Sequence, residues 1–504
     1  MQKKALQKNK LIIVSNRLPI VLSKDESNGN EWSLEPGSGG LVTALAPVLK
    51  NRGGLWIGWS GVTKEKMGQG VGKLLQNEAK DYGYDLKPVT LTEEDLSKFY
   101  YGFSNEIIWP LFHDLQTRCN FSPEYWETYK KVNRNYADVI AKNAGNEDYI
   151  WVHDYQLMNV ARELRRKGLK NKMGFFMHIP FPAFDIFIKL PWRFKILKAL
   201  LEYDLIGFQT VRDRRNFVEC VRRLLKDTLV FGKGQILTCD SGDRKPRIGT
   251  FPISIDFNEF AKMAASEEVS ETAWYLHEDI PSRHLILGVD RLDYTKGIPN
   301  KLEAFRTALL RYPEMQNKVT LIQIVVPSRA DIPEYHDLKV EIERLVGEIN
   351  GQFTNSGWVP IHYMFKSVCR RELLAYYRTC ETALVTPLKD GMNLVAKEYC
   401  ASSVDGTGAL ILSEFAGVAA QLQRNALLVN PYDIEEVAET IYKSFSMDKD
   451  ERRLRMRRMR RSIKENNIFK WVDSFLRASI AKNLDYFPIT EDYVPKVKQN
   501  NVFL

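Results

Sequence analysis

Short apolar runs, bounded by polar turns, alternate along the chain with stretches of helical periodicity. Apolar runs of this length are typical of parallel strands that are covered on both faces. The expected strands are Lys10–Val14, Tyr149–His153, Met173–His178, Leu205–Thr210, Leu285–Val289, Val319–Val326, Thr382–Thr386, Ala409–Ser413 and Ala426–Val429. Helical periods lie between many of them, for example over Tyr155–Lys167, Arg212–Lys226 and Lys301–Arg311. This alternation predicts an α/β fold with doubly wound sheets.

The expected strands fall into two groups, before and after about residue 250. Pro252 lies between the groups, and proline fixes the backbone and ends a preceding strand. We therefore predict an N-terminal domain over 1–250, a C-terminal domain over 251–470, and a helix and tail over 471–504 that pack back on the N-terminal domain.

The composition excludes some classes of protein but does not change the predicted fold. With 504 residues and 44% hydrophobic positions, the chain has ample material for buried cores, so disorder as the main state is excluded. Six cysteines without a C-x-x-C pair favour a reducing compartment, and we expect the cytoplasm. No apolar run is long enough to cross a membrane. The sequence pI of about 9.0 raises the question of an acidic partner.

Most of the excess positive charge lies in one segment, Arg452–Lys464, which holds eight cations and no acid. Removing these cations reduces the net charge from +9 to +1. Met456, Met459 and Ile463 follow a helical spacing, which predicts a helix that packs one stripe and exposes the rest to solvent. We therefore expect neither a nucleic-acid nor a membrane partner.

A phosphate site is indicated after the strand at Thr382–Thr386. The segment Asp390–Glu398 (DGMNLVAKE) has the order strand, glycine turn, helix, which leaves free backbone N–H groups at a helix N-terminus. Asp390 could accept a hydrogen bond from a sugar hydroxyl, and Glu398 could reach a ribose diol. A plain turn with Asp390 as the cap is the alternative interpretation.

A second cationic loop follows the strand at Leu285–Val289. Arg291 and Lys296 lie at a carboxyl end of a predicted parallel strand, where ligands of doubly wound sheets collect, and could clamp a diphosphate. Asp290 and Asp293 lie in the same loop. We interpret them as solvated turn acids in preference to a metal pair.

Two successive strands of the first domain end in polar residues, His153-Asp154 and His178. A histidine at such a position is more often a hydrogen-bonded core residue, but two strands ending this way at one edge indicate a site. No zinc-ligand spacing accompanies them, so no metal is predicted. Gly39 and Gly40 permit close approach of a ligand, yet no G-x-G-x-x-G pattern supports a nicotinamide enzyme.

Taken together, these segments resemble the trehalose-6-phosphate synthases, which are retaining glycosyltransferases of family 20 with the GT-B fold. The resemblance runs from Leu11 to about Val472. It is carried by SNR (15–17), GLWIGWSG (54–61), FSNEIIWPLFH (103–113), WVHDYQL (151–157), HIPFP (178–182), GFQT (207–210), DRLDYTKG (290–297), PSR (327–329) and DGMNLVAKE (390–398). The implied architecture is two Rossmann-like domains that face a deep cleft, with the acceptor bound by the first and the nucleotide sugar by the second.

The resemblance also implies roles for individual residues. Arg291 and Lys296 would neutralise the donor diphosphate, and Glu398 would bind the ribose. The implied donor-binding residues are Gly40, His178, Arg291, Lys296, Asp390, Gly391, Met392, Asn393, Leu394 and Glu398. The implied acceptor-binding residues are Arg17, Trp59, Tyr100, Trp109, Asp154 and Arg329. The implied catalytic residues are Asp154, His178, Arg291, Lys296 and Asp390.

The implied reaction moves glucose from UDP-glucose to glucose 6-phosphate, giving α,α-trehalose 6-phosphate and UDP without a metal or another cofactor. Fixed cations and helix-end amides can stabilise the departing diphosphate. A separate phosphatase would act on the product, and homo-oligomer formation is left open. Two alternatives stay open: a sister glycosyltransferase with a glycerol phosphate or aminocyclitol phosphate acceptor, and a non-catalytic regulatory subunit.

Overall fold

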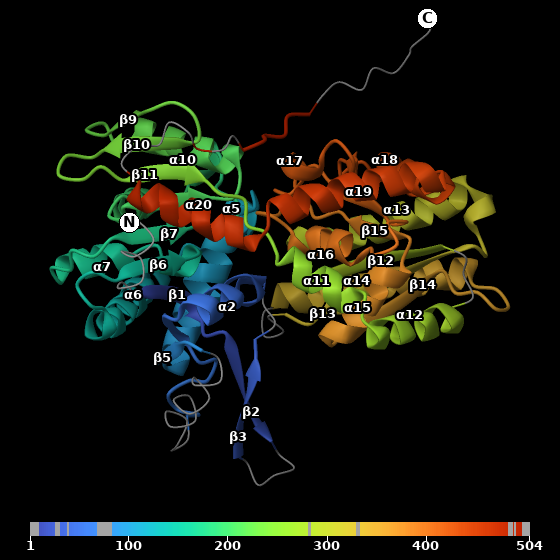
Figure 1. The fold of residues 1–504 in the computed structure, drawn as a ribbon, viewed down its shortest axis with the longest axis horizontal. Coiled ribbons are helices and arrows are strands. Elements are labelled where there is room, and N and C mark those ends of the chain that lie inside the picture. The colour runs from blue at the N-terminus through green and yellow to red at the C-terminus, as the bar shows by residue number, and fades with distance from the viewer. Residues whose placement is uncertain are drawn as a thin grey trace, which may run out of the picture. The chain divides into compact units, whose positions relative to one another are not determined.

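The computed structural model describes residues 10–25, 31–37, 40–67, 83–280, 284–328, 333–481, 487 and 490–495. The chain divides into two compact units, Met1–Ile253 with Ile468–Thr490, and Ser254–Asn467 with Glu491–Leu504. Each unit contains its own twisted sheet with helices packed on it, as Figure 1 shows. The predicted α/β class is therefore confirmed. The assignment of an acceptor role to one range and a donor role to the other stays a prediction.

The described part of the first unit has a nine-stranded sheet in the order β5-β4-β1-β6-β7-β8-β11-β10-β9. Its pairs are parallel from β5 to β11 and antiparallel from β11 to β9, and β2 and β3 form a separate hairpin. The strands are β1 Leu11–Arg17, β2 Ile20–Asp25, β3 Glu31–Pro36, β4 Leu55–Trp59, β5 Asp85–Val89, β6 Tyr149–His153, β7 Met173–Phe176, β8 Leu205–Phe208, β9 Leu229–Phe231, β10 Ile236–Asp240 and β11 Arg247–Thr250.

The helices of the first unit include one that comes from far along the sequence. They are α2 Gly40–Arg52, α4 Glu93–Asp95, η2 Leu96–Ile108, α5 Trp109–Phe112, η3 Gln116–Arg118, α6 Pro123–Asn143, η4 Tyr155–Leu157, α7 Val160–Arg166, α8 Phe184–Phe187, α9 Arg193–Leu200, α10 Val211–Leu224 and α20 Ile468–Ile480. On α20, Phe475 stacks on Trp151 at 4.3 Å between ring centres. A Cβ atom on Gly174 or on Gly207 would come within 2.7 Å of the Phe475 ring, so both strands need glycine there.

The second unit contains a fully parallel six-stranded sheet in the order β14-β13-β12-β15-β16-β17. The strands are β12 His284–Arg291, β13 Val319–Val326, β14 Ile361–Phe365, β15 Thr382–Val385, β16 Ala409–Ser413 and β17 Leu427–Val429. The helices are α11 Phe257–Ala264, α12 Glu267–Asp279, η5 Tyr294–Lys296, α13 Ile298–Arg311, η6 Pro313–Met315, α14 Pro333–Phe353, α15 Arg370–Thr379, α16 Leu394–Ser402, α17 Ala419–Leu422, α18 Ile434–Ser446 and α19 Lys449–Glu465.

All nine runs expected to be strands contain a strand, but the sequence pattern missed others. In β4 and β14 the apolar run is interrupted, by Gly58 in LWIGW and by His362 and Tyr363 in IHYMF. The helix predicted from Tyr155 is wrong at its start. Residues 155–157 form a buried 3₁₀ turn after the left-handed residue Asp154, and the α-helix begins at Val160.

The arginine-rich segment forms the predicted helix α19, and Met456, Met459 and Ile463 are buried on one stripe. The expectation that its cations are all solvated is wrong. Arg452 is 8% exposed and donates through Nη2 to the carbonyl oxygens of Ser444 and Phe445, at the C-terminal end of α18. Helix ends carry unsatisfied carbonyl groups, and a guanidinium group satisfies them.

Candidate active site

Arg17 is the last residue of β1, and its guanidinium group lies over two aromatic rings. The guanidinium carbon is 4.8 Å from the centre of the Trp59 ring and 5.9 Å from that of Tyr100. The Ser15 hydroxyl donates to the carbonyl oxygen of Arg17 at 2.6 Å. A Cβ atom on Gly58 would come within 2.7 Å of the Arg17 carbonyl carbon, so glycine allows β4 to approach β1. The result is a fixed cation supported by π faces, which suits an anionic ligand.

Tyr100 is held by an unusual helix. It lies in η2, a π-helix of 13 residues, and π-helical turns are frequent at functional sites. Asn105 donates from Nδ2 to the carbonyl oxygen of Tyr100 at 2.6 Å, and its Oδ1 accepts from the Tyr155 hydroxyl at 3.1 Å. The ring of Trp109, which begins α5, lies 5.9 Å from the Tyr155 ring. The structure therefore brings Arg17, Trp59 and Tyr100 together and joins Trp109 to them through Tyr155.

Asp154 follows β6 and His178 lies just after β7, at the same edge of the sheet. Because β6 and β7 are parallel neighbours, their carboxyl ends meet there. Asp154 has a φ of 76°, a conformation that costs energy for a residue with a Cβ atom and that is found most often at functional sites. Its Oδ1 accepts from the backbone N–H of His178 at 3.1 Å. This bond fixes the carboxylate relative to the imidazole.

His178 also contacts a second histidine. Its Nε2 lies 3.1 Å from Nδ1 of His153, which is fully buried at the end of β6. Burial lowers the pKa of His178 to about 3. Burial, and next the neighbouring His178, lowers the pKa of His153 well below its ordinary value. Both imidazoles are therefore neutral at neutral pH, and one must donate to the other.

In the second unit, Lys296 and Asp390 form an ion pair. Lys296 ends η5, after β12, and its Nζ lies 2.6 Å from Oδ2 of Asp390, which follows β15. The backbone N–H of Leu388 donates to the carbonyl oxygen of Thr295 at 2.8 Å and ties the two loops together. Gly297, with a φ of 62°, allows the chain to turn directly into α13. The two predicted loops therefore converge at adjacent strand ends.

The turn before α16 is organised by two side chains. Asp390 Oδ1 accepts from the backbone N–H of Met392 at 3.3 Å, and Asp390 Oδ2 accepts from Nδ2 of Asn393 at 3.2 Å. Asn393 caps α16, because its Oδ1 accepts from the backbone N–H of Ala396 at 3.1 Å. Asn393 has a φ of 72°, a further strained residue in this turn. A strained turn at a helix N-terminus is a suitable cradle for phosphate oxygens.

The other two predicted donor residues of this unit differ in exposure. Glu398 is partly buried on α16, and its Oε2 accepts from the Tyr377 hydroxyl at 3.0 Å. Burial raises the pKa of Glu398 above its ordinary value. Arg291 is exposed at the end of β12. It is therefore accessible to a ligand at the carboxyl ends of the strands.

The interpretation of Asp290 and Asp293 as solvated acids is wrong. Asp290 is 6% and Asp293 1% exposed. Asp290 Oδ2 lies 2.5 Å from Nζ of Lys301 and accepts from Nε2 of Gln323 at 3.1 Å. Asp293 Oδ1 accepts from both the backbone and the hydroxyl of Thr295, at 3.0 and 2.8 Å. The donors compensate for the burial of each carboxylate. The same hydrogen bonds stabilise the loop.

Gly40 and Arg329 complete the predicted residues. Gly40 is the first residue of α2 in the first unit, and Arg329 lies outside the described residues. The predicted acceptor residues that are described, together with His178 and Gly40, belong to the first unit. The other predicted donor residues belong to the second unit.

Sequence reasoning missed residues that position the predicted ones. Asn105 and Tyr155 connect Tyr100 to Trp109, and Tyr377 holds Glu398. Asn105 and Tyr155 lie inside the motifs FSNEIIWPLFH and WVHDYQL, and this position in the motifs is the sequence signal that could have identified them. Tyr377 lies on α15, in no motif, and no signal could have found it. Burial also lowers the pKa of Lys397, next to Glu398, to about 7.

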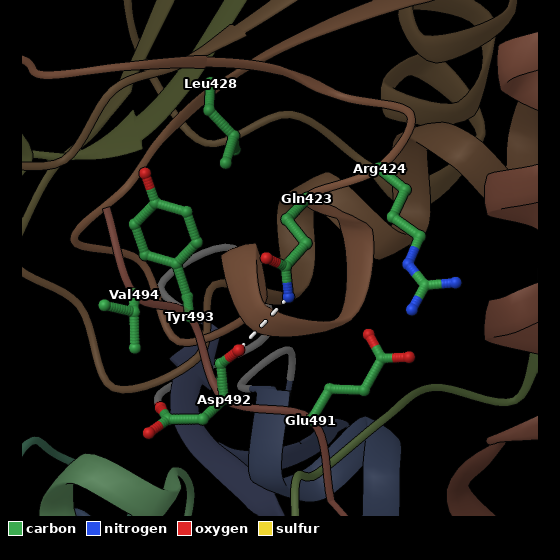
Figure 2. Close-up of a pocket in the computed structure, with 7 residues that line it drawn as sticks. All are labelled: Gln423, Arg424, Leu428, Glu491, Asp492, Tyr493 and Val494. Atoms are coloured by element: carbon green, nitrogen blue, oxygen red, sulfur yellow. Dashed lines mark hydrogen bonds between the residues drawn. The ribbon is translucent and has the colours of Figure 1, made fainter. Parts of the chain in front are cut away.

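A cavity of about 490 Å³ in the second unit lies apart from the predicted residues. Figure 2 shows its lining residues, which are Gln423, Arg424, Leu428, Glu491, Asp492, Tyr493 and Val494. Gln423 Nε2 donates to the carbonyl oxygen of Asp492 at 3.2 Å, and the Tyr493 hydroxyl donates to Glu414 Oε2 at 2.7 Å. The segment Glu491–Val494 is therefore attached to α17 and to the loop after β16.

Over the described ranges, no helix is long and apolar enough to cross a bilayer. In the same residues, His, Cys, Asp and Glu side chains form no group of three or more that could hold a metal ion.

Comparison with known proteins identifies the family. The sequence signature of glycosyltransferase family 20 matches residues 9–480. A trehalose-6-phosphate synthase of Mycobacterium avium (strain 104) is 39% identical over 472 residues, which cover 93% of this chain and 94% of that protein. The chain therefore belongs to glycosyltransferase family 20.

Solved structures agree with this assignment. A UDP-forming α,α-trehalose-phosphate synthase from Burkholderia xenovorans, in complex with glucose 6-phosphate, matches with a TM-score of 0.84 and 35% identity over 93% of this chain and all of that one. An E. coli structure described as trehalose-6-phosphate bound with UDP-2-fluoro glucose matches with a TM-score of 0.82 and 36% identity, covering 94% of this chain and 99% of that one. The fold class is thus GT-B.

Proposed function

We propose that this chain transfers glucose from UDP-glucose to glucose 6-phosphate with retention of configuration, releasing UDP and α,α-trehalose 6-phosphate. Its activity is that of an α,α-trehalose-phosphate synthase (UDP-forming). The observation that carries the proposal is the near-complete match to relatives with this activity, together with two residue sets whose chemistry suits the two substrates. Lys296 is paired with Asp390 of the donor turn, and an arginine on aromatic rings is the proposed acceptor cation.

The donor half of the site is assigned to the second unit. Arg291, Lys296 and the N–H groups from Gly391 to Leu394 would hold the diphosphate, and Glu398 would accept from the ribose. The fixed Lys296–Asp390 pair supports this role, because preorganised charge needs no rearrangement as the leaving group develops. Asp390, with His178 and Gly40 of the first unit, would contact the transferred glucose.

The acceptor half is assigned to the first unit. Arg17, Tyr100, Trp109 and Arg329 would bind the phosphate of glucose 6-phosphate, with Asp154 and Trp59 beside its sugar ring. The Arg17 guanidinium over two rings supports this role, since a planar fork binds phosphate oxygens in pairs. We also propose that the protein acts in the cytoplasm and that a separate phosphatase acts on its product, and homo-oligomer formation stays open. Six free cysteines support a reducing compartment.

In the proposed step, the bond between the glucose anomeric carbon and the diphosphate oxygen breaks as the bond to the acceptor's anomeric oxygen forms on the same face. The acceptor's hydroxyl proton passes to a phosphate oxygen of the departing UDP. Neutral His178 would donate or accept one hydrogen bond to glucose, and the low pKa of His178 keeps it uncharged near pH 7.

The test is release of UDP from UDP-glucose by the purified chain, with and without glucose 6-phosphate, followed by NMR of the product. We expect UDP release that depends on glucose 6-phosphate and a product in which one linkage joins two α-anomeric carbons. Glycerol phosphate and an aminocyclitol phosphate serve as comparison acceptors. Faster transfer to either would establish the sister activity, and no transfer to any of them by folded protein would establish a non-catalytic role.

A further inference from the structure

The arginine-rich helix α19 borders a cavity that the proposed reaction does not use. The cavity has a volume of about 430 Å³ and is lined by Val404, Asp405, Gly406, Arg453, Arg457 and Arg460. Residues 404–406 form the turn that follows α16. The three arginines are spaced at i, i+4 and i+7, so they lie on one face of α19. Cavities of this size accommodate small ligands.

The cavity is lined by none of the other arginines of α19, which are Arg452, Arg455, Arg458 and Arg461. Arg452 binds the carbonyl oxygens at the end of α18. Arg455 pairs with Glu451 at 2.7 Å and Arg461 with Glu465 at 3.1 Å. In the described part of the chain, Arg457 and Arg458 have no acidic partner within ion-pair distance, and Arg457 alone of these two lines the cavity.

Arg460 is fixed in place by the end of a helix. Its Nη1 donates to the carbonyl oxygens of Cys400, Ala401 and Ser403, at 2.9, 2.5 and 2.9 Å. Its guanidinium carbon also lies 5.2 Å from the centre of the Phe257 ring. These contacts occupy Nη1 and leave Nε and Nη2 for a further acceptor. The guanidinium group is therefore preorganised at the cavity wall before any ligand arrives.

The charge balance of the cavity favours an anion. Three guanidinium groups and one carboxylate, that of Asp405, line the cavity, and Arg453 makes a loose exposed ion pair with Asp450 at 3.7 Å. Exposed ion pairs of this kind contribute little to stability, so Arg453 can turn to a ligand at small cost. Guanidinium groups bind phosphate oxygens by paired, charge-assisted hydrogen bonds.

We propose that this cavity is a binding site for a small phosphate-bearing anion, held by Arg453, Arg457 and Arg460 and separate from both proposed substrate sites. The convergence of three arginines on one cavity of limited volume favours a small anion over a nucleic acid or a membrane surface, which would contact the outer face of α19 as a whole. The site lies at the C-terminal end of α16, the helix whose other end carries the proposed donor turn.

The test measures inorganic phosphate binding to the full chain by calorimetry at about pH 8, where phosphate is mainly a dianion. Arg457→Glu is compared with Arg458→Glu, a matched charge reversal one residue away that lies outside the cavity. We expect Arg457→Glu to weaken binding by about tenfold or more and Arg458→Glu by less than about twofold, since a charge-assisted hydrogen bond contributes roughly that much. Both variants retain every proposed substrate residue, so the comparison does not depend on turnover.

A second variant keeps the test decisive if charge reversal unfolds α19. Asp405→Asn removes the one carboxylate of the cavity and is expected to tighten phosphate binding. Crystals of the full chain soaked in selenate should show an anomalous peak between Arg457 and Arg460. Equal weakening by the two arginine variants, no effect of Asp405→Asn, or a selenate peak without a difference in solution affinity would each overturn the proposal.

Discussion

The two units hold their proposed substrate residues by different physical means. In the first unit, aromatic packing and a π-helix fix a cation and a neutral histidine pair. In the second unit, ion pairs and side-chain hydrogen bonds to backbone fix a turn at a helix N-terminus. Under the proposed function, the sugar phosphate would be bound by one cation that is held by aromatic rings. The nucleotide diphosphate would be bound by a polar network.

The second unit also contains two lysine–aspartate pairs that look alike in sequence and differ in burial. The side chains of Lys296 and Asp390 are 12% and 17% exposed, whereas those of Lys301 and Asp290 are 0% and 3% exposed. The accessible pair can meet a ligand, and the inaccessible one can act only on the fold. Four substitutions test these differences.

The largest expected effect is on stability. Lys301→Met should lower the free energy of unfolding by about 3–5 kcal/mol, because it leaves the Asp290 carboxylate buried without its cation. Denaturant unfolding followed by circular dichroism measures this change. The double variant Lys301→Met, Asp290→Asn should recover part of the loss. A single variant as stable as the parent chain would show that the pair contributes nothing to the fold.

Next in size is an effect on rate. Lys296→Met should lower kcat for UDP release by about 10²–10³, because it removes one preorganised donor from the departing diphosphate. Its unfolding free energy should change far less than that of Lys301→Met. Steady-state kinetics and denaturant unfolding of the two variants side by side provide the measurement. A stability loss with unchanged kcat would reverse the roles assigned to the two pairs.

A smaller effect separates the two units. Arg17→Lys keeps the charge but loses the planar fork over Trp59 and Tyr100, so the KM for glucose 6-phosphate should rise by about tenfold or more. The KM for UDP-glucose should stay within about twofold. Arg193→Lys is the control, since Arg193 lies 5.0 Å from the Phe194 ring in the same unit but outside the site. An equal rise in both KM values would argue against separate acceptor and donor halves.

The last expected effect is on the slope of stability against pH. Burial lowers the pKa of His178 to about 3, so this group stabilises the fold fully above pH 6.5 and progressively less as the pH falls toward 3. His178→Asn should therefore reduce the acid slope of the unfolding free energy by about 1.4 kcal/mol per pH unit in this window. Burial also lowers the pKa of His284 in the second unit to about 3, and His284→Asn should give a similar change. An unaltered slope in His178→Asn would contradict a buried neutral imidazole.

The sequence points to candidate site residues but not to the interactions that hold them. Arg291, Lys296 and the segment Asp390–Glu398 are predicted because cations and a glycine turn after parallel strands carry a local signal. The pairing of Lys296 with Asp390 joins residues 94 positions apart and has no local signal. The prediction that Asp290 and Asp293 are solvated is wrong because their burial has no local signal either. It depends on Lys301, Gln323 and Thr295, which pack around them.

The residue pattern alone was sufficient to predict the α/β class, nine of the strands, the helix of Arg452–Lys464 and the family, because hydrophobic periodicity and contiguous motifs are local properties. Three other features are visible only in the folded chain: Phe475 packs on Trp151, His153 contacts His178, and Arg460 binds the last carbonyl groups of α16. Each of these depends on how segments distant in the chain are buried together. Burial sets both the pKa of an imidazole and the cost of an unpaired charge, and no linear pattern of residues specifies it.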